Sequence, residues 1–175
     1  MTPVELVRDA PQRERAPRGD TVVRRARATD VPGIAALVDE WAAESLLLPR
    51  SAAEIALAID DYIVATDGRG RVLACAALRE YSPSLAELVS VAVSRRAHGR
   101  GLGRLVVSGV EALAAMRGHA AVFAHTLQPD FFAALGYEAT DRTRFPEKRA
   151  RSHTLCVQRS LVAADAPRLR LAAAA

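Results

Sequence analysis

Apolar residues recur with a helical period in two stretches of the chain. Ile34, Leu37, Val38 and Trp41 lie three or four positions apart and form one stripe. A second stripe consists of Leu102, Leu105, Val106, Val110, Leu113 and Ala114. Each pattern predicts an amphipathic helix whose apolar face is buried.

Two start signals place the helices of the first third of the chain. Thr29-Asp30-Val31-Pro32 combines a capping side chain with a proline in the first turn. Ser51 and Glu54 have the spacing of a capping box, and Ile55 and Ile59 follow. The sequence therefore predicts one helix after Asp30 and a second after Ser51.

Stretches rich in valine, leucine and alanine alternate with turn residues and predict strands. Tyr62–Thr66 and Arg71–Leu78 form a predicted hairpin around the turn at 67–70, Tyr81–Ser84 is a predicted loop, and Leu85–Val93 is a third predicted strand. The remaining elements are strands at Val22–Arg27, Ala120–His125, Tyr137–Thr140 and His153–Leu161, and a short helix at Pro129–Leu135. The order does not alternate strictly between strands and helices, which indicates a mixed α/β fold.

The ends of the chain differ from its middle. Residues 1–20 mix charged residues with prolines and read as a flexible leader, 21–162 as one domain, and 163–175 as a flexible, alanine-rich tail. The leader has no apolar segment typical of a signal peptide, and no apolar run approaches the roughly 20 residues of a membrane span. We therefore expect a cytoplasmic protein with no membrane contact.

Composition narrows the classes of function. The 175 residues carry a net charge of +4, and 23 of the 24 basic residues are arginine, so a single arginine is weak evidence of a site. Aromatic residues make up 5% of the chain, which argues against a nucleic-acid-binding surface. Cys75 and Cys156 have no metal-binding or redox spacing, so reduced thiols and no bound metal are expected.

The turn at 96–103 directly follows a predicted strand and directly opens a predicted helix. Its glycines, Gly99, Gly101 and Gly103, stand at alternate positions among arginines. Unpaired amides at a helix start attract phosphate oxygens, and glycines let the backbone approach them. The spacing matches neither the dinucleotide fingerprint nor a P-loop. A glycine-rich connection without a ligand is the alternative.

The segment Leu88–Leu105 resembles the acetyl-CoA motif of the GNAT acetyltransferase superfamily. That motif is an apolar strand, then Arg/Gln-x-x-Gly-x-Gly/Ala, then a helix, and Arg96, Gly99 and Gly101 match it. The resemblance covers roughly 22–161. It implies the GNAT fold, in the α/β class, with a mixed, mostly antiparallel sheet of six or seven strands flanked by about four helices.

The resemblance also assigns the coenzyme site. It implies that acetyl-CoA is the co-substrate and that main-chain groups of Val91, Ala92 and Val93 pair with its pantetheine arm, as an added strand would. The pyrophosphate would lie against Arg96 and the amides of His98, Gly99, Arg100, Gly101, Leu102, Gly103 and Arg104. A homodimer is compatible with the resemblance, because members often dimerise through their late strands.

Acetyl transfer to an amine requires a base, and Glu87 is the candidate. It is a carboxylate in an otherwise apolar predicted strand, where GNAT enzymes often hold their general base; an edge charge is the alternative. Members usually have a tyrosine acid at the position of Phe132, which cannot donate a proton. His125 could serve as acid or substrate contact, or be structural. Tyr137 is expected in the core.

Three stretches resemble the short, GNAT-only amino-acid N-acetyltransferases that make N-acetylglutamate. They are Leu46–Ser51, Ala86–Val93, and Thr126–Phe132 with Leu135–Tyr137 and Phe145–Lys148. An amino acid brings a carboxylate, which Arg50 or Lys148 could bind, although either can equally be a surface residue. Val89 stands where that group usually has arginine, and 149–153 also depart from its pattern.

These residues leave three functions open. The first is N-acetylation of a small-molecule amine, most of all an amino acid such as glutamate. The second keeps the acetyltransferase but changes the acceptor to a protein N-terminus, a polyamine or a drug amine. The third is a sensor domain that binds acetyl-CoA without catalysis, which Phe132 favours.

Overall fold

The computed structural model describes residues 21–144 and 154–161. The strands are β1 (Val22–Arg25), β2 (Tyr62–Thr66), β3 (Val72–Ser82), β4 (Leu85–Val93), β5 (Ala121–Thr126), β6 (Glu138–Ala139) and β7 (Leu155–Ser160). The α-helices are α1 (Val31–Ala42), α2 (Ala52–Leu57), α3 (Leu102–Met116) and α4 (Pro129–Ala133). This mixed α/β architecture confirms the predicted fold class. None of these helices has the length and apolarity that crossing a membrane requires.

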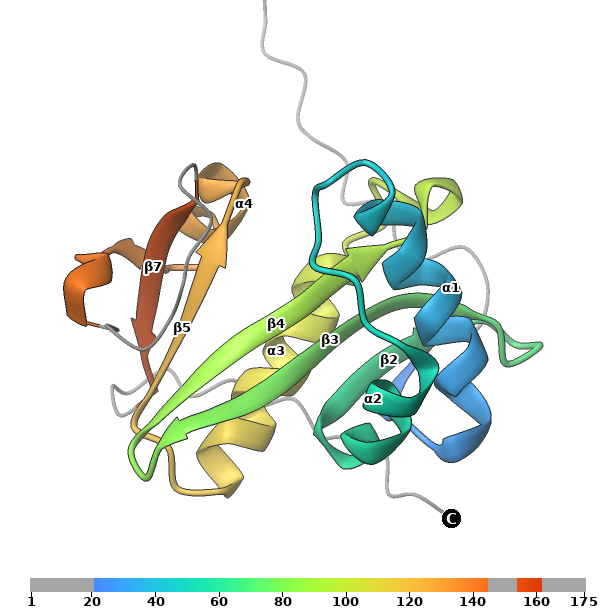
Figure 1. The fold of residues 1–175 in the computed structure, drawn as a ribbon, viewed down its shortest axis with the longest axis horizontal. Helices are drawn as coiled ribbons and strands as arrows, with labels where there is room; N and C mark the ends of the chain where they lie inside the picture. Colours follow the sequence, from blue (N-terminus) through green and yellow to red (C-terminus); the bar gives the residue numbers. More distant parts are fainter. Residues whose placement is uncertain (1–20, 145–153, 162–175) are drawn as a thin grey trace, which may run out of the picture.

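The strands form one sheet in the order β1-β2-β3-β4-β5-β7-β6 (Figure 1). Neighbouring strands are antiparallel except β4 and β5, which are parallel. That parallel pairing joins only Leu85–Glu87 to Ala121–Phe123. Beyond these residues the two strands part, and Figure 1 shows the resulting fork. Within the described residues, the fork leaves one side of β4 without a neighbouring strand from position 88 onward.

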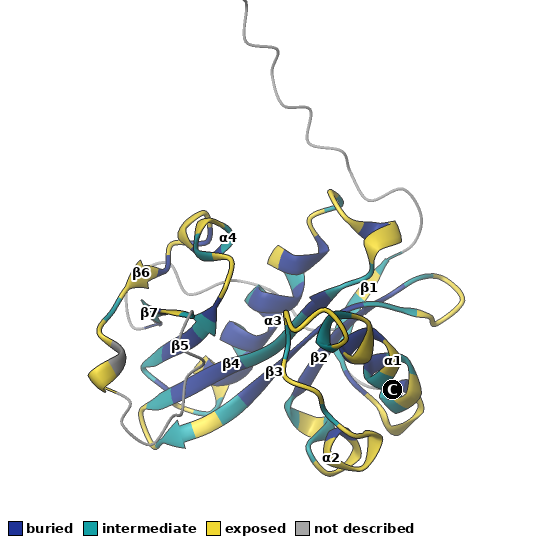
Figure 2. Ribbon diagram, turned by 45° about the horizontal axis from the view of Figure 1, so that its top comes forward, coloured by how far each residue is buried: buried dark blue, intermediate teal, exposed yellow. Residues whose placement is uncertain are grey.

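The helices cover the two faces of the sheet, and the strands alternate between them. In β2, Ile63 and Ala65 pack in the cluster that contains α3, whereas Tyr62 and Val64 pack in the cluster that contains α1 and α2. This is the period of two expected of a strand that is buried on both faces. Figure 2 shows the buried residues concentrated in the central strands and α3, with exposed residues on α2 and the loop before it.

The predicted boundaries hold closely, with one correction. Ser51 caps α2 as expected: its hydroxyl accepts from the Glu54 amide at 3.2 Å, and the Glu54 carboxylate accepts from the Ser51 amide at 2.8 Å. The loop predicted at Tyr81–Ser84 is wrong in length, because β3 continues to Ser82 and pairs it with Leu85. The continued ladder leaves a turn of two residues. The predicted leader and tail lie outside the described residues.

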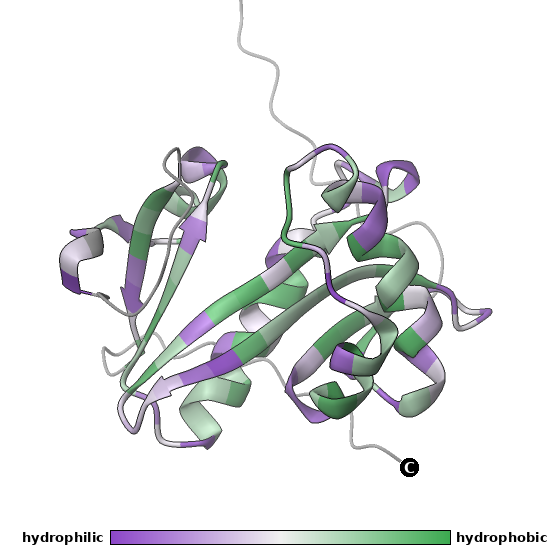
Figure 3. Ribbon diagram, viewed as in Figure 1, coloured by the Kyte–Doolittle hydropathy of each residue, from purple (hydrophilic) through white to green (hydrophobic). Residues whose placement is uncertain are grey.

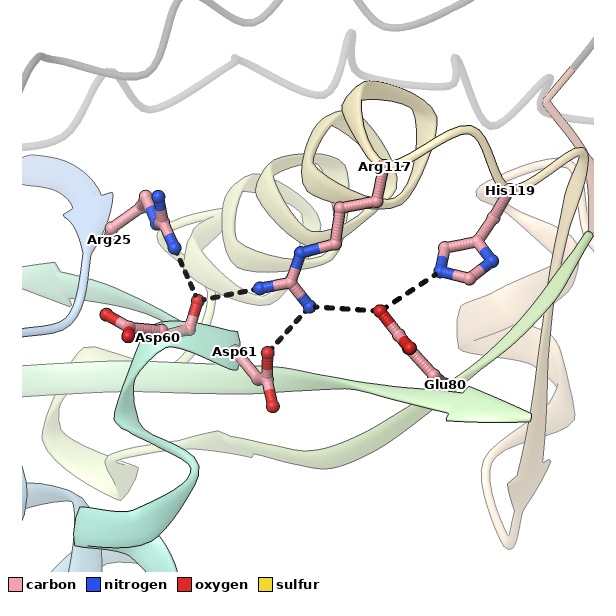
Figure 4. A network of polar contacts seen from close by, with 6 residues as sticks. All are labelled: Arg25, Asp60, Asp61, Glu80, Arg117 and His119. Atoms are coloured by element: carbon pink, nitrogen blue, oxygen red, sulfur yellow. Dashed lines mark hydrogen bonds and ion pairs between the residues drawn. The ribbon is translucent and has the colours of Figure 1, made fainter. Parts of the chain in front are cut away.

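A polar network joins the end of α3 to β1, to β3 and to the helical turn just before β2 (Figure 4). Arg117 contacts the Asp61 carboxylate at 2.6 Å and Glu80 at 3.8 Å. The main-chain oxygen of Asp60 accepts from both Arg117 and Arg25. Ion pairs this exposed contribute little one by one. As a connected set they link the end of α3 to β1, to β3 and to the turn before β2.

Asp30, at the start of α1, is held by a buried ion pair that should stabilise the fold. Its carboxylate accepts from Arg24 at 2.7 and 3.0 Å and from the Arg27 amide at 2.7 Å, and 4% of its side chain is exposed. Burial raises the pKa of Asp30, but the hydrogen bonds from Arg24 and Arg27 outweigh it, and the pKa is lowered. We expect Asp30→Asn to lower the free energy of unfolding at pH 7 by about 1–3 kcal/mol, as measured by urea denaturation.

The loss of stability caused by Asp30→Asn should become smaller as the pH falls. Because the pKa of Asp30 is lower in the folded protein than in the unfolded chain, its ionised carboxylate stabilises the fold at pH values above the ordinary aspartate pKa of about 4. This stabilisation disappears as the pH falls through the lowered pKa. The difference between wild type and variant should therefore shrink below pH 4. Asp39→Asn, at an exposed position of the same helix, is the matched control and should change little. Equal effects of the two variants would contradict the prediction.

Candidate active site

A cleft of about 630 Å³ occupies the fork between β4 and β5. Its walls come from β4, β5, α4 and the loop that joins α1 to α2. Three leucines of that loop, Leu46, Leu47 and Leu48, line it, as do Trp41 and Phe131. The cleft is therefore largely apolar, with a small number of charged side chains at one end, which is the usual composition of a small-molecule site.

Glu87 stands where β4 and β5 separate. It is the last residue of β4 paired with β5, opposite Phe123, and its exposed fraction is 6%. Arg79 Nη1 lies 3.6 Å from Glu87 Oε2, and His125 Nδ1 lies 3.6 Å from Glu87 Oε1. Figure 3 shows the hydrophilic stretches of β3 and β4 side by side near this end of the sheet. Glu87 and His125, predicted separately from sequence, thus meet in one site.

Arg79 is a residue of this site that sequence reasoning missed. Because Ser82 pairs with Leu85, a regular ladder would place Glu80 opposite Glu87. The register shifts between Glu80 and Ser82, so Arg79 takes that position instead. Two carboxylates directly opposite would repel, whereas arginine opposite glutamate is favourable. The irregularity therefore supplies a positive partner for Glu87.

The free side of β4 exposes main-chain groups to the cleft. Ser94 N donates to Leu73 O at 2.8 Å, and Ala74 pairs with Val93. In an antiparallel ladder this makes Ala74 and Val93 a non-hydrogen-bonded pair, so the N–H and C=O of Val93 point away from β3. A bulge precedes them, where Ser90 has φ 54° and the register shifts. Val93 thus offers the main-chain edge expected for a pantetheine arm.

Ala92 has a different orientation from Val93. It pairs with Cys75, and alternation directs its N–H and C=O toward β3. Its main chain is therefore turned away from the cleft, although the residue lines it. Val91 also lines the cleft, immediately after Ser90 in the bulge. The predicted coenzyme contacts of all three residues remain predictions.

The glycine-rich turn has the shape that phosphate binding requires. Gly99 and Gly101 have φ of 71° and 74°, in the left-handed region that glycine adopts without strain. Gly101 is the N-cap of α3, and the first helical bond runs from Leu105 N to Gly101 O. The three preceding amides have no acceptor within the helix and lie at its positive end. These residues fit the pyrophosphate of a coenzyme.

Gly103 has an additional reason to be glycine. A Cβ there would lie 3.2 Å from two ring atoms of Phe131, which belongs to α4. The missing side chain thus permits close packing between α3 and α4. Two arginines near the turn have contacts within the protein: Arg100 donates to the Thr21 hydroxyl at 3.2 Å, and Arg104 to Ala134 O at 3.2 Å. Arg96 is exposed.

Arg50 lines the cleft, as does Arg79, and the two arginines also line a smaller pocket beside it. Its side chain is 21% exposed, and its Nη1 lies 3.7 Å from Glu54 Oε1. That separation is long for a hydrogen bond, so the guanidinium keeps donors for another partner. Lys148, the other predicted carboxylate ligand, lies outside the described residues.

Phe132 and Tyr137 belong to the core. Phe132 is 4% exposed and packs edge-to-face on Tyr137 with ring centroids 5.1 Å apart. Tyr137 is equally buried, and burial together with Glu111 raises its pKa well above the ordinary value. A tyrosine so buried is a poor proton donor for a ligand in the cleft. The prediction that Tyr137 is a core residue is confirmed.

Comparisons with known proteins agree with this geometry. The model of a family described as acetyltransferase (GNAT) family matches residues 33–138. An uncharacterized N-acetyltransferase of Chlorobaculum tepidum is 38% identical over 143 residues, which cover 82% of this chain and 92% of that protein. An amino-acid acetyltransferase of Mycobacterium tuberculosis is 35% identical over 124 residues, covering 70% and 71%. A solved structure of a protein from Mycobacterium tuberculosis in complex with CoA is 26% identical, with a TM-score of 0.73, and the match covers 81% of this chain and 99% of that one.

Proposed function

The chain belongs to the GNAT family of acetyltransferases and is an acetyl-CoA-dependent N-acetyltransferase, and we propose that its acceptor is the amine of a free amino acid such as glutamate. The observation that carries this proposal is that Arg50, Arg79 and Glu87 line one cleft, with Arg79 paired to Glu87 and Arg50 sharing a second, smaller pocket with Arg79. A carboxylate base and two guanidinium groups there suit a molecule that has both an amine and a carboxylate. The relative named amino-acid acetyltransferase supports the same acceptor class.

In this proposal Glu87 is the general base. It accepts the proton that the amine loses, directly or through one water, and the amine nitrogen then attacks the thioester carbonyl carbon. Its burial and its contacts with Arg79 and His125 hold the carboxylate at the end of the cleft. His125, whose Nδ1 lies 3.6 Å from Glu87 Oε1, is the proposed acid or substrate contact beside this base.

The strand β4 and the turn before α3 hold the donor in this proposal. A main-chain N–H within Val91–Val93 donates to the thioester oxygen as negative charge develops on it. The amides at the start of α3 bind the pyrophosphate. The carbon–nitrogen bond forms, the carbon–sulfur bond breaks, and the sulfur leaves as a thiolate. With an ordinary thiol pKa of about 8.5, the thiolate is a tolerable leaving group without a tyrosine acid.

A panel of acceptors tests the proposal directly. Free thiol release from acetyl-CoA is followed with single amino acids, including glutamate, and with putrescine and a short peptide as acceptors of the competing classes. We expect the largest acceleration with an amino acid. Acceleration only by the polyamine or the peptide would overturn the acceptor class while leaving the acetyltransferase intact.

Arg50 should contribute mainly to acceptor binding. Removing a charge-assisted hydrogen bond costs about 1.5–3 kcal/mol, so Arg50→Ala should raise the acceptor KM about 10- to 100-fold with little change in the acetyl-CoA KM. Arg69→Ala, at an exposed position in the turn between β2 and β3, is the matched control and should leave both values unchanged. An unchanged acceptor KM in Arg50→Ala would count against a carboxylate contact there.

The sensor function left open by the sequence is not favoured by the family to which the chain belongs. Phe132 and Tyr137 are both buried and neither can supply a proton to the cleft, but the thiolate can leave without such an acid. A sensor would bind acetyl-CoA and release no thiol with any acceptor of the panel.

A further inference from the structure

The main-chain oxygen of Val93 accepts hydrogen bonds from two side chains. Trp41 Nε1 donates to it at 3.1 Å, and His98 Nε2 lies 3.1 Å from it. Because a carbonyl only accepts, the Nε2 atom of His98 must carry the proton. The two rings are also stacked, with centroids 5.5 Å apart and planes 2° from parallel. Helix α1 and the turn before α3 therefore converge on one atom of β4.

That atom is a main-chain acceptor on the side of β4 that faces away from β3. A carbonyl oxygen has two lone pairs, and Trp41 and His98 use both. A pantetheine arm that lies along β4 as an added strand carries amide N–H groups and needs main-chain acceptors. An additional donor at Val93 O must therefore displace one of the two side chains.

Of the two side chains, His98 is the one free to leave. Trp41 is half-buried, and the Arg95 guanidinium lies 4.4 Å from its ring centroid. Arg95 is in turn paired with Glu40 and Glu44 of the same region, so Trp41 is fixed from several sides. His98 is exposed, and it precedes Gly99 in the turn. Its imidazole can exchange the Val93 bond for one to water.

We propose that His98 is a latch on β4, a side chain that occupies a hydrogen-bonding position of the coenzyme in the free protein. Its imidazole is hydrogen-bonded to the Val93 oxygen and leaves it when the pantetheine arm binds, while Trp41 keeps its own hydrogen bond and holds the carbonyl in orientation. This rests on the proposed coenzyme site but not on the identity of the acceptor. The latch competes with the pantetheine arm and not with the nucleotide half of the coenzyme. It therefore lowers affinity for CoA selectively.

The competition predicts a gain of affinity when the latch is removed. A neutral hydrogen bond contributes about 0.5–1.5 kcal/mol, so His98→Ala should bind CoA about 2- to 10-fold more tightly by calorimetry. Adenosine 3′,5′-bisphosphate, which lacks the pantetheine arm, should bind wild type and variant equally. His98→Gln, which keeps a donor in reach of the carbonyl, should restore affinity close to that of wild type.

Tryptophan fluorescence reads the same event. Trp41 is the single tryptophan of the chain, and its ring stacks on His98. Because Trp41 also lines the cleft, the CoA-induced change in its emission is compared between wild type and His98→Ala, and it should differ between them by the part that is due to the departing imidazole. Unchanged or weaker CoA binding by His98→Ala would overturn the latch and leave the coenzyme site standing. No binding of CoA to wild type would overturn both.

Discussion

Replacing Glu87 by glutamine should lower kcat about 100- to 10,000-fold, the range expected for loss of a general base. The amide has nearly the shape of the carboxylate but cannot accept the proton of the amine. The residue sits 6% exposed at the point where β4 leaves β5, so the shape-conserving change should leave the fold in place. Thiol release at saturating acetyl-CoA and acceptor measures the effect.

The same variant distinguishes the base from a structural charge. CoA should bind Glu87→Gln with wild-type affinity in calorimetry, because the proposed coenzyme contacts lie further along β4 and in the turn before α3. Glu138→Gln, an exposed glutamate of β6, is the matched control and should keep full turnover. Turnover within a few-fold of wild type in Glu87→Gln would remove Glu87 from its proposed role.

The largest expected effect on stability is at Arg159, the partner of a deeply buried carboxylate. Glu111 is 1% exposed, and Arg159 Nη1 lies 3.4 Å from its Oε1 and 2.5 Å from Leu135 O. Removing one partner of a buried pair leaves a charge in a medium of low polarity. Arg159 is partly exposed, so we expect Arg159→Met to lower the free energy of unfolding by about 2–4 kcal/mol in denaturant titrations at pH 7.5.

The sign of the pH dependence follows from Glu111. Burial raises its pKa, although Arg159 and Tyr137 oppose the shift, and removing Arg159 raises it further. An acid whose pKa is raised in the folded protein favours folding at low pH, and this contribution is lost as the pH rises through the raised value. The cost of Arg159→Met should therefore shrink from pH 7.5 to pH 5. Arg144→Met, at an exposed arginine, is the control; a pH-independent cost would contradict the explanation.

Most of the fold could be predicted from the sequence because local patterns determine it. The bounds of β2 and β4 agree with the predicted strands, and α3 begins at the first residue of its apolar stripe. What could not be predicted is how the strands meet. The extension of β3 to Ser82 and the bulge at Ser90 depend on how two strands pair. The pattern of apolar and polar residues within a single strand contains no information about that pairing.

In the candidate site, too, some residues could be predicted from the sequence and others could not. Glu87 could be identified because a charge in an apolar strand is unusual, and the glycines because their spacing at a strand-to-helix turn is. Arg79 could not, since a shift of one register position decides whether it or Glu80 faces Glu87. The contact of Trp41 with Val93 joins residues 52 positions apart, so it follows from how α1 packs on the sheet and not from any motif.

Because β4 and β5 pair in parallel, the length of the connection between α3 and β5 determines which residues of β5 lie beside β4. Residues 117–120 carry the chain from α3 to β5, and the amides of Ala120 and Ala121 are fastened to Ser84 O, just before β4 begins. A single residue more or less there, with α3 held in place, would slide β5 by about 3.3 Å and turn each of its side chains to the opposite face. His125 would then point away from Glu87. The distance between these two side chains thus depends on the number of residues in a loop that precedes β5.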